Sequence, residues 1–141
     1  MEHPDRDVRR AAVNAMIGVA GKGSAAAVAF ASSRLGHADP EVRWAAVDVL
    51  GKLALPGDEA TVLALNDRMK DEDGAVRQAA VEALVSVVGV VDDRAVSAVR
   101  GAFYEDPDQG VRAATLGLLQ VQTRALVLRG LAQRRCGPPS D

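Results

Sequence analysis

The stretch "DPEVRWAAVDVL", residues 39–50, decides the fold because close copies of it return along the chain. The copies are "DRDVRRAAVNAM" from Asp5, "DGAVRQAAVEAL" from Asp73 and "DQGVRAATLGLL" from Asp108. The Val-Arg pair of each copy stands at 8/9, 42/43, 76/77 and 111/112, so the spacing is 34 residues twice and then 35. Self-similarity at a period of this size is typical of repeat solenoids.

Each copy is predicted to form an α-helix that begins at its aspartate. Asp39 followed by Pro40 is a helix-starting pair, because the carboxylate can accept from free backbone N–H groups and proline lacks a donor that the first turn does not use. Asp5, Asp73 and Asp108 are expected to cap their helices in the same way. Downstream of Asp39, apolar residues recur at steps of three and four and form one stripe: Val42, Ala46, Val49, Leu50 and Leu53.

A second apolar register with the same period lies between these Val-Arg helices. Its rows, spaced 34 residues apart, are Val28, Val62 and Val96; Ala31, Leu65 and Val99; and Leu35, Met69 and Phe103. Each second helix is preceded by a loop that contains Gly or Pro, namely "GKG", "LPG" and "GVV". Polar residues follow these loops at the expected N-cap positions: Ser24, Asp58 and Asp92. Two helices per unit form a hairpin, and hairpins must stack because neither stripe can be buried within one unit.

The predicted fold is therefore an all-α superhelix, an α solenoid of about four helical hairpins of about 34 residues each. We expect one repeat domain over 1–136, with units at about 3–36, 37–70, 71–104 and 105–136, and a flexible tail at 137–141. The fourth unit departs from the pattern, because "TRALVLRGLAQRR" copies the second register only roughly. This segment is either part of one long helix or a closing cap.

Composition supports helices packed on helices. Hydrophobic residues make up 48% of the chain but aromatic residues only 3%, so the core must consist of small aliphatic side chains. Seventeen basic and 19 acidic residues leave a formal net charge of −2, so no overall field attracts nucleic acid or anionic lipid. The single cysteine, Cys136, excludes an internal disulfide and a cysteine cluster for a metal.

The sequence predicts neither a membrane span nor a secretory signal. Its most apolar stretch, "VEALVSVVGVV" at 81–91, is too short to cross a bilayer. The start "MEHPDRDVRR" lacks a basic segment followed by an apolar run. We therefore expect a soluble, cytoplasmic protein.

With its period, its Asp-(Pro)-x-Val-Arg starts and the continuation "AAVDVLGKL", the chain resembles the HEAT family, especially the short HEAT-like repeats of the phycobilisome-lyase type. The resemblance covers residues 3 to about 121. It implies that the repeated Asp and Arg residues form a ladder between units, with Asp39 and Arg43, and Asp73 and Arg77, orienting the turns. Arg9 and Arg112 would join this ladder. A row of arginines could instead bind phosphates, but its registry with the core favours scaffolding.

The resemblance also implies that the Val-Arg helices face the inside of the curve. Positions that vary between units against a repeated background then mark the exposed concave surface. The predicted partner-binding residues are Arg10, Asn14, Trp44, Asp48, Lys52, Gln78, Glu82 and Ser86, and the stripe would continue through Gly18 and through Ala113, Gly117 and Val121. Trp44 either anchors a partner or lies flat over Arg10 or Gln78.

The sequence offers little for catalysis. His3 and His37 are not followed by Glu, so they lack the His-Glu pairs of the diiron HEAT-like hydroxylases and are interpreted as capping or surface residues. The acidic turns at 70–74 and 105–108 could hold a cation, but capping explains them better. No Ser-His-Asp set and no phosphate-binding loop can be assembled. We therefore predict no catalytic residue, no metal and no cofactor.

The leading functional prediction is a non-catalytic scaffold that binds a protein or peptide on the concave face. The alternative from the resemblance is an enzyme or enzyme accessory, such as a bilin-lyase-like subunit, or a nucleic-acid-binding HEAT-like protein. Nucleic acid is disfavoured by the mixed charge of the stripe, although one basic segment lacks acids from 112 to 135: Arg112, Arg124, Arg129, Arg134 and Arg135. An end-to-end homodimer through an uncapped end also stays open.

Overall fold

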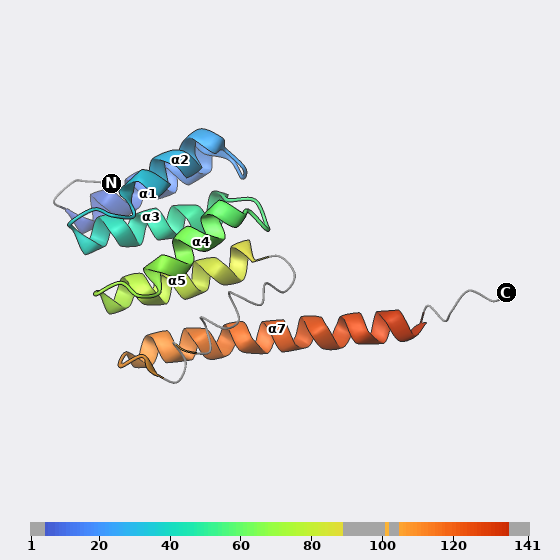
Figure 1. Ribbon diagram of the computed structural model, residues 1–141. Helices are drawn as coiled ribbons and strands as arrows, with labels where there is room; N and C mark the ends of the chain where they lie inside the picture. The colour runs from blue at the N-terminus through green and yellow to red at the C-terminus, as the bar shows by residue number, and fades with distance from the viewer. Residues whose placement is uncertain (1–4, 89–100, 102–104, 136–141) are drawn as a thin grey trace.

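The computed structural model describes residues 5–88, 101 and 105–135, and all regular structure in these ranges is helical. This confirms the predicted all-α class. The described helices, which Figure 1 shows as a stack, are α1 (Arg6–Ala20), α2 (Ala25–Arg34), α3 (Pro40–Leu53), α4 (Glu59–Arg68), α5 (Gly74–Val87) and α7 (Gln109–Arg135).

The four Val-Arg helices, α1, α3, α5 and α7, follow one another in one layer of the stack (Figure 1). α3 packs against both α1 and α5, and α5 packs in turn against α7. The second helices lie on this layer, where α2 packs against α3 and α4 packs against α5. Each second helix thus covers the Val-Arg helix of the following unit, which interlocks consecutive units into a solenoid.

The repeated apolar register forms the core. All five stripe residues of α3, from Val42 to Leu53, are buried, and so are their counterparts in α5. In the second register Ala31, Leu65 and Met69 are buried as predicted, whereas Val96, Val99 and Phe103 lie outside the described residues. The helices begin at the predicted caps: Asp5, Ser24, Asp39, Asp58 and Asp73 each accept from a backbone N–H in the first turn.

Arginine rungs join the turns at one end of the hairpins. The Arg43 guanidinium donates from Nε and Nη2 to the two carboxylate oxygens of Asp71, both at 2.9 Å, and from Nη1 to the carbonyls of His37 and Ala38. Arg77 repeats this arrangement with Asp106, at 2.8 and 3.1 Å. Each arginine therefore binds the turn before its own helix and the acid of the next turn.

The ladder itself was predicted, but the acids named for it were wrong. Asp39 and Asp73 cap helices, whereas the acids that bind Arg43 and Arg77 stand two residues before a cap, at Asp71 and Asp106. Comparison of the repeats did not reveal this acid position, because the unit before Asp71 has His37 at the equivalent place. Arg112 makes the same contacts to its own turn, donating to the carbonyls of Asp106 and Pro107.

Burial and charge decide the ionisation of these rungs. Burial alone would raise the pKa of Asp71, but hydrogen bonds from Arg43 and from the Asp73 amide outweigh it, and the pKa of Asp71 lies below its usual value. The pKa of Asp106 is lowered in the same way by Arg77 and the Asp108 amide, against the effect of burial. Both rungs are therefore full ion pairs, shielded from water by the packed turns.

Backbone hydrogen bonds join the loops at the other end of the hairpins. The Gly23 amide donates to the Leu53 carbonyl at 2.6 Å, and 34 residues later the Gly57 amide donates to the Val87 carbonyl at 2.7 Å. Gly23 and Gly57 have φ angles of 83° and 80°, which side chains of L-residues rarely tolerate. Glycine at these positions lets each loop reach the end of the next Val-Arg helix.

The last described helix differs from the others. α7 runs without interruption for 27 residues and extends beyond the stack in Figure 1. Of the two readings of the fourth unit, the continuous helix is therefore confirmed. The predicted tail and Cys136 lie outside the described residues.

Candidate functional site

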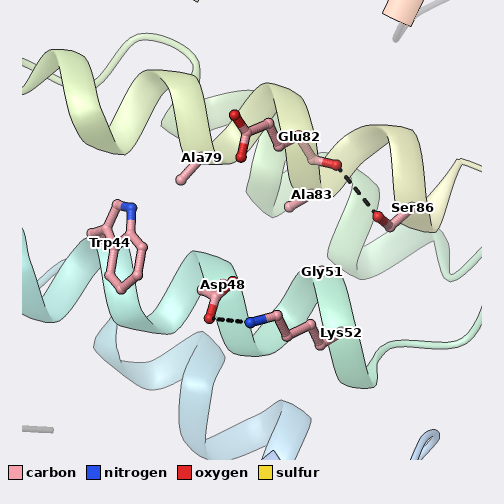
Figure 2. A pocket seen from close by; sticks show the side chains of 8 residues that line it. All are labelled: Trp44, Asp48, Gly51, Lys52, Ala79, Glu82, Ala83 and Ser86. Carbon is pink, nitrogen blue, oxygen red and sulfur yellow. Dashed lines mark hydrogen bonds and ion pairs between the residues drawn. The ribbon is translucent and has the colours of Figure 1, made fainter. Parts of the chain in front are cut away.

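The predicted stripe lies across α1, α3 and α5, where two adjoining pockets open. The first pocket, between α3 and α5, has a volume of about 200 Å³. Figure 2 shows its wall of larger side chains, which includes five of the predicted residues: Trp44, Asp48, Lys52, Glu82 and Ser86. The structure therefore brings together residues that the sequence separates by as many as 42 positions, from 44 to 86.

The second pocket lies between α1 and α3 and measures about 280 Å³. Arg10, Val13 and Asn14 line it from α1, and it shares Trp44, Asp48 and Lys52 with the first pocket. The two pockets are thus neighbouring parts of one groove. Gln78 lines neither of them but donates from Nε2 to Oε1 of Glu82 at 3.0 Å, so it orients a residue of the wall.

The floor of the first pocket consists of small residues that sequence reasoning did not select: Gly51, Ala79 and Ala83. A Cβ atom on Gly51 would lie only 2.8 Å from the Cβ of Ala83, so α3 and α5 approach closely at this point. Gly51 stands where the neighbouring units have Ile17 and Val85. This exchange of a large residue for glycine inside a core register was the available signal for the pocket.

Trp44 separates the two pockets. Its ring is half-buried against the core, and the Arg10 guanidinium carbon lies 5.1 Å from the ring centroid. The interpretation that the ring stacks with Arg10 is therefore confirmed. The indole nevertheless lines both pockets, so a ligand in either one would contact it.

The charged side chains of the groove change from basic to acidic between α1 and α5. At the centre of the groove Lys52 Nζ lies 2.8 Å from Oδ2 of Asp48, and the opposite charges of this ion pair cancel. The exposed charges that remain among the lining residues are Arg10 at the α1 edge and Glu82 at the α5 edge. The groove is therefore basic on the side of α1 and acidic on the side of α5.

A third pocket, of about 500 Å³, lies at the loop end of the stack and was not predicted. Its wall is formed by apolar residues of α2 and of the loop between α3 and α4: Val28, Ala29, Leu55 and Pro56. The one ionisable residue on its wall, Asp58, caps α4. This pocket offers an apolar surface without groups that could perform chemistry.

The other candidates have structural roles or lie outside the description. Nδ1 of His37 accepts from the Asp39 amide at 3.0 Å, as expected of a capping residue, and His3 lies outside the described residues. Arg124 is exposed on α7, whereas the side chains of Arg129, Arg134 and Arg135 are not described. In the described ranges no three or more His, Cys, Asp or Glu side chains are grouped as metal ligands, and no helix there is long and apolar enough to cross a membrane.

Comparison with known proteins agrees with the repeat architecture. No curated protein matches the chain. A family model of HEAT repeats matches residues 1–84 and, in a second overlapping match, residues 53–120. With the interlocked hairpins, the arginine rungs and the 34-residue period, this match shows that the chain belongs to the HEAT repeat family.

Proposed function

We propose that the chain is a non-catalytic interaction module that binds a protein segment in the groove over α1, α3 and α5. HEAT repeats are commonly protein-interaction scaffolds and generally non-catalytic. The observation that carries the proposal is the position of the residues that vary between units. Seven of the eight predicted residues line the two pockets, and Gln78 holds the wall residue Glu82.

The packing of the two layers supports a concave groove. The Val-Arg helices contact one another along the stack, whereas α2 and α4 make their main contacts with the Val-Arg layer and not with each other. A stack whose helices are close in one layer and open in the other curves towards the close layer. The groove then lies on the inner side of the curve, where a segment can contact several units at once.

The size of the pockets favours side chains over a cofactor. Volumes of about 200 and 280 Å³ fall below the ~300–1,000 Å³ that is usual for small-molecule sites. Each pocket can accept one or two side chains of a bound segment. Small residues on the floor and Trp44 between the pockets provide apolar contact for such side chains.

The order of charges specifies which segment fits. Arg10 favours an acidic side chain at the α1 edge, and Glu82 favours a basic one at the α5 edge. An apolar or aromatic residue between them would cover Trp44. The same mixture of charges is unfavourable for a nucleic-acid backbone, which requires a basic groove.

A displayed library of random linear peptides, selected on the full chain, tests this proposal. We expect enriched peptides with a basic and an acidic residue flanking an apolar one. Trp44→Ala should weaken their binding roughly tenfold or more, because a central aromatic residue carries much of such an interface. Glu82→Lys should remove the preference for the basic residue, and since Glu82 is exposed this change spares the core.

Leu63→Ala provides the matched control. Leu63 is an exposed apolar residue on α4, away from the groove, and its loss should leave peptide binding unchanged. Circular dichroism of each variant checks that the helices persist. Peptides that bind the wild type, Trp44→Ala and Glu82→Lys equally would contradict the proposal, as would selection that enriches no common pattern.

A further inference from the structure

α1 exposes an apolar face whose counterparts in the rest of the stack are covered. Five residues of α3 on this face, namely Val42, Ala45, Ala46, Val49 and Leu53, are each exposed by 2% or less. The residues that stand 34 positions earlier are Val8, Ala11, Ala12, Ala15 and Val19, and all five are exposed in α1. Val8 is 44% exposed and Val19 is 89% exposed.

This face is the packing surface between units. In α5 the counterpart of Ala15 is Ala83, which lies against Gly51 of the preceding Val-Arg helix. In α3 the face is covered by α1 and α2. The opposite side of α1, with Val13 and Arg9, is already buried against α3. The exposed side of α1 therefore has the chemistry of an interface that the fold uses elsewhere.

We propose that this face of α1 packs against the same face of a second copy of the chain, with the two helices antiparallel about a twofold axis. A twofold interface requires a surface that complements itself. Antiparallel pairing about the point between Val13 and Asn14 places Val8 of one copy near Val19 of the other, and Ala12 near Ala15. The valines fill the two ends while the alanines let the helix backbones approach at the centre.

Charge supports the antiparallel direction. The same pairing places the acidic N-cap of α1, Asp5, near Lys22 of the second copy, just beyond the C-terminus of its α1. Opposite charges then meet at both ends of the helix pair. The helix dipoles are also aligned favourably when the helices are antiparallel.

The outer side of α7 fits α1 less well. Leu116 is exposed there, but Gln120 and Thr123 stand where α5 has Val85 and Val88. Packing of α1 on α7 would therefore place the apolar end of α1 on polar side chains. It would also add copies head to tail without closing, whereas the twofold pairing ends at a dimer.

The expected dimer is weak. α1 has 15 residues and is about 22 Å long, so a contact made by one helix pair is small beside the usual interface sizes of ~1,200–2,000 Å². Association should therefore depend on protein concentration and not be permanent. Sedimentation equilibrium over a wide concentration range is expected to show a monomer that converts to a dimer and no larger species.

Two substitutions test whether the dimer contact lies on the exposed face of α1. Val19→Asp should keep the chain monomeric at every concentration, because it puts a charge into the apolar contact, and the exposure of Val19 means that the monomer can tolerate it. Lys22→Glu should weaken the dimer several-fold at low salt, with part of the loss recovered at high salt. Leu63→Asp, at an exposed apolar residue of α4, is the matched control and should dimerise like the wild type.

Circular dichroism of the variants separates a lost contact from a lost fold. A wild type that stays monomeric at all concentrations would overturn the proposal. So would dimers of Val19→Asp that are as stable as those of the wild type. Masses that keep growing beyond the dimer would assign the contact to α7 instead.

Discussion

The first and second rungs of the arginine ladder hold equivalent turns with unequal strength. Arg43 and Asp71 form a bidentate pair with side chains exposed by only 6% and 2%. In the first rung Arg9 Nη2 lies 3.9 Å from Oε2 of Glu41, and the Glu41 side chain is 35% exposed. The arginine is the same in both rungs, but the position two residues before the cap holds Asp71 in one and His37 in the other. The residue at that position therefore decides whether a bidentate ion pair joins the neighbouring units.

The difference teaches that a regular repeat need not give a uniformly stable stack. α3 and α5 are joined by a buried ion pair, a close helix contact at Gly51 and a loop hydrogen bond. α1 is joined to α3 through a longer ion pair whose acid is partly exposed, and α1 exposes an apolar face. In a solenoid, stability is a sum over such neighbouring contacts, so unfolding should begin at α1.

The largest expected effect comes from breaking the second rung. Asp71→Ala leaves Arg43 without its buried carboxylate partner and removes one acceptor of Arg68 and the acceptor of the Asp73 amide. Loss of one partner of a buried pair costs about 3–5 kcal/mol of unfolding free energy. The matched change in the first rung, Glu41→Ala, removes a longer and partly exposed contact and should cost less than about 1 kcal/mol.

Urea unfolding of both variants measures this comparison. Equal losses for Asp71→Ala and Glu41→Ala would show that the two rungs couple their units with the same strength. That result would remove the basis for an unevenly stable stack.

A smaller effect is expected from the close contact between α3 and α5. Gly51→Ala places a Cβ 2.8 Å from the Cβ of Ala83 and 2.9 Å from its Cα, so the two helices must separate. The overpacking cost of ~1–3 kcal/mol, reduced by the better helix propensity of alanine, leaves a net loss of about 1 kcal/mol. Gly18→Ala in α1 meets nothing within 4 Å and should gain about 0.5–1 kcal/mol.

Thermal unfolding of these two variants should therefore shift the midpoint in opposite directions. If Gly51→Ala is as stable as Gly18→Ala, the helices of the α3–α5 contact can separate without loss, and the close packing there does not contribute to stability.

The smallest effect is a gain at the first rung. His37 occupies the place of Asp71, and both residues accept from the amide of the capping aspartate. His37→Asp keeps that acceptor and offers Arg9 a carboxylate like the one that binds Arg43. We expect the unfolding free energy to rise by about 1 kcal/mol.

His37→Asn is the control, because it retains an oxygen acceptor without the charge. Urea unfolding should rank His37→Asp above His37→Asn. A reversed order would mean that Arg9 cannot reach the carboxylate in the geometry of the first turn.

The predictions from sequence succeeded where one residue reports on local structure. The caps at Asp39 and Asp73 and the core positions of α3 followed from helix chemistry and from periodicity alone. The prediction failed for the acids of the ladder, because Asp71 meets Arg43 only after two turns distant in sequence are stacked. The binding role of the groove is a proposal, and seven of the eight residues chosen for it line the two pockets.

The sequence by itself determined the helices, their ends and the period, because these depend on hydrogen bonds and apolar spacing within a few residues. It also determined the class of architecture, since each hairpin has a stripe that only a neighbour can cover. Only the tertiary structure decided which acid meets which arginine, how Gly51 brings α3 close to α5, and why Val19 is exposed while its counterpart Leu53 is buried. These properties depend on contacts between two units, so the local sequence around one residue does not determine them.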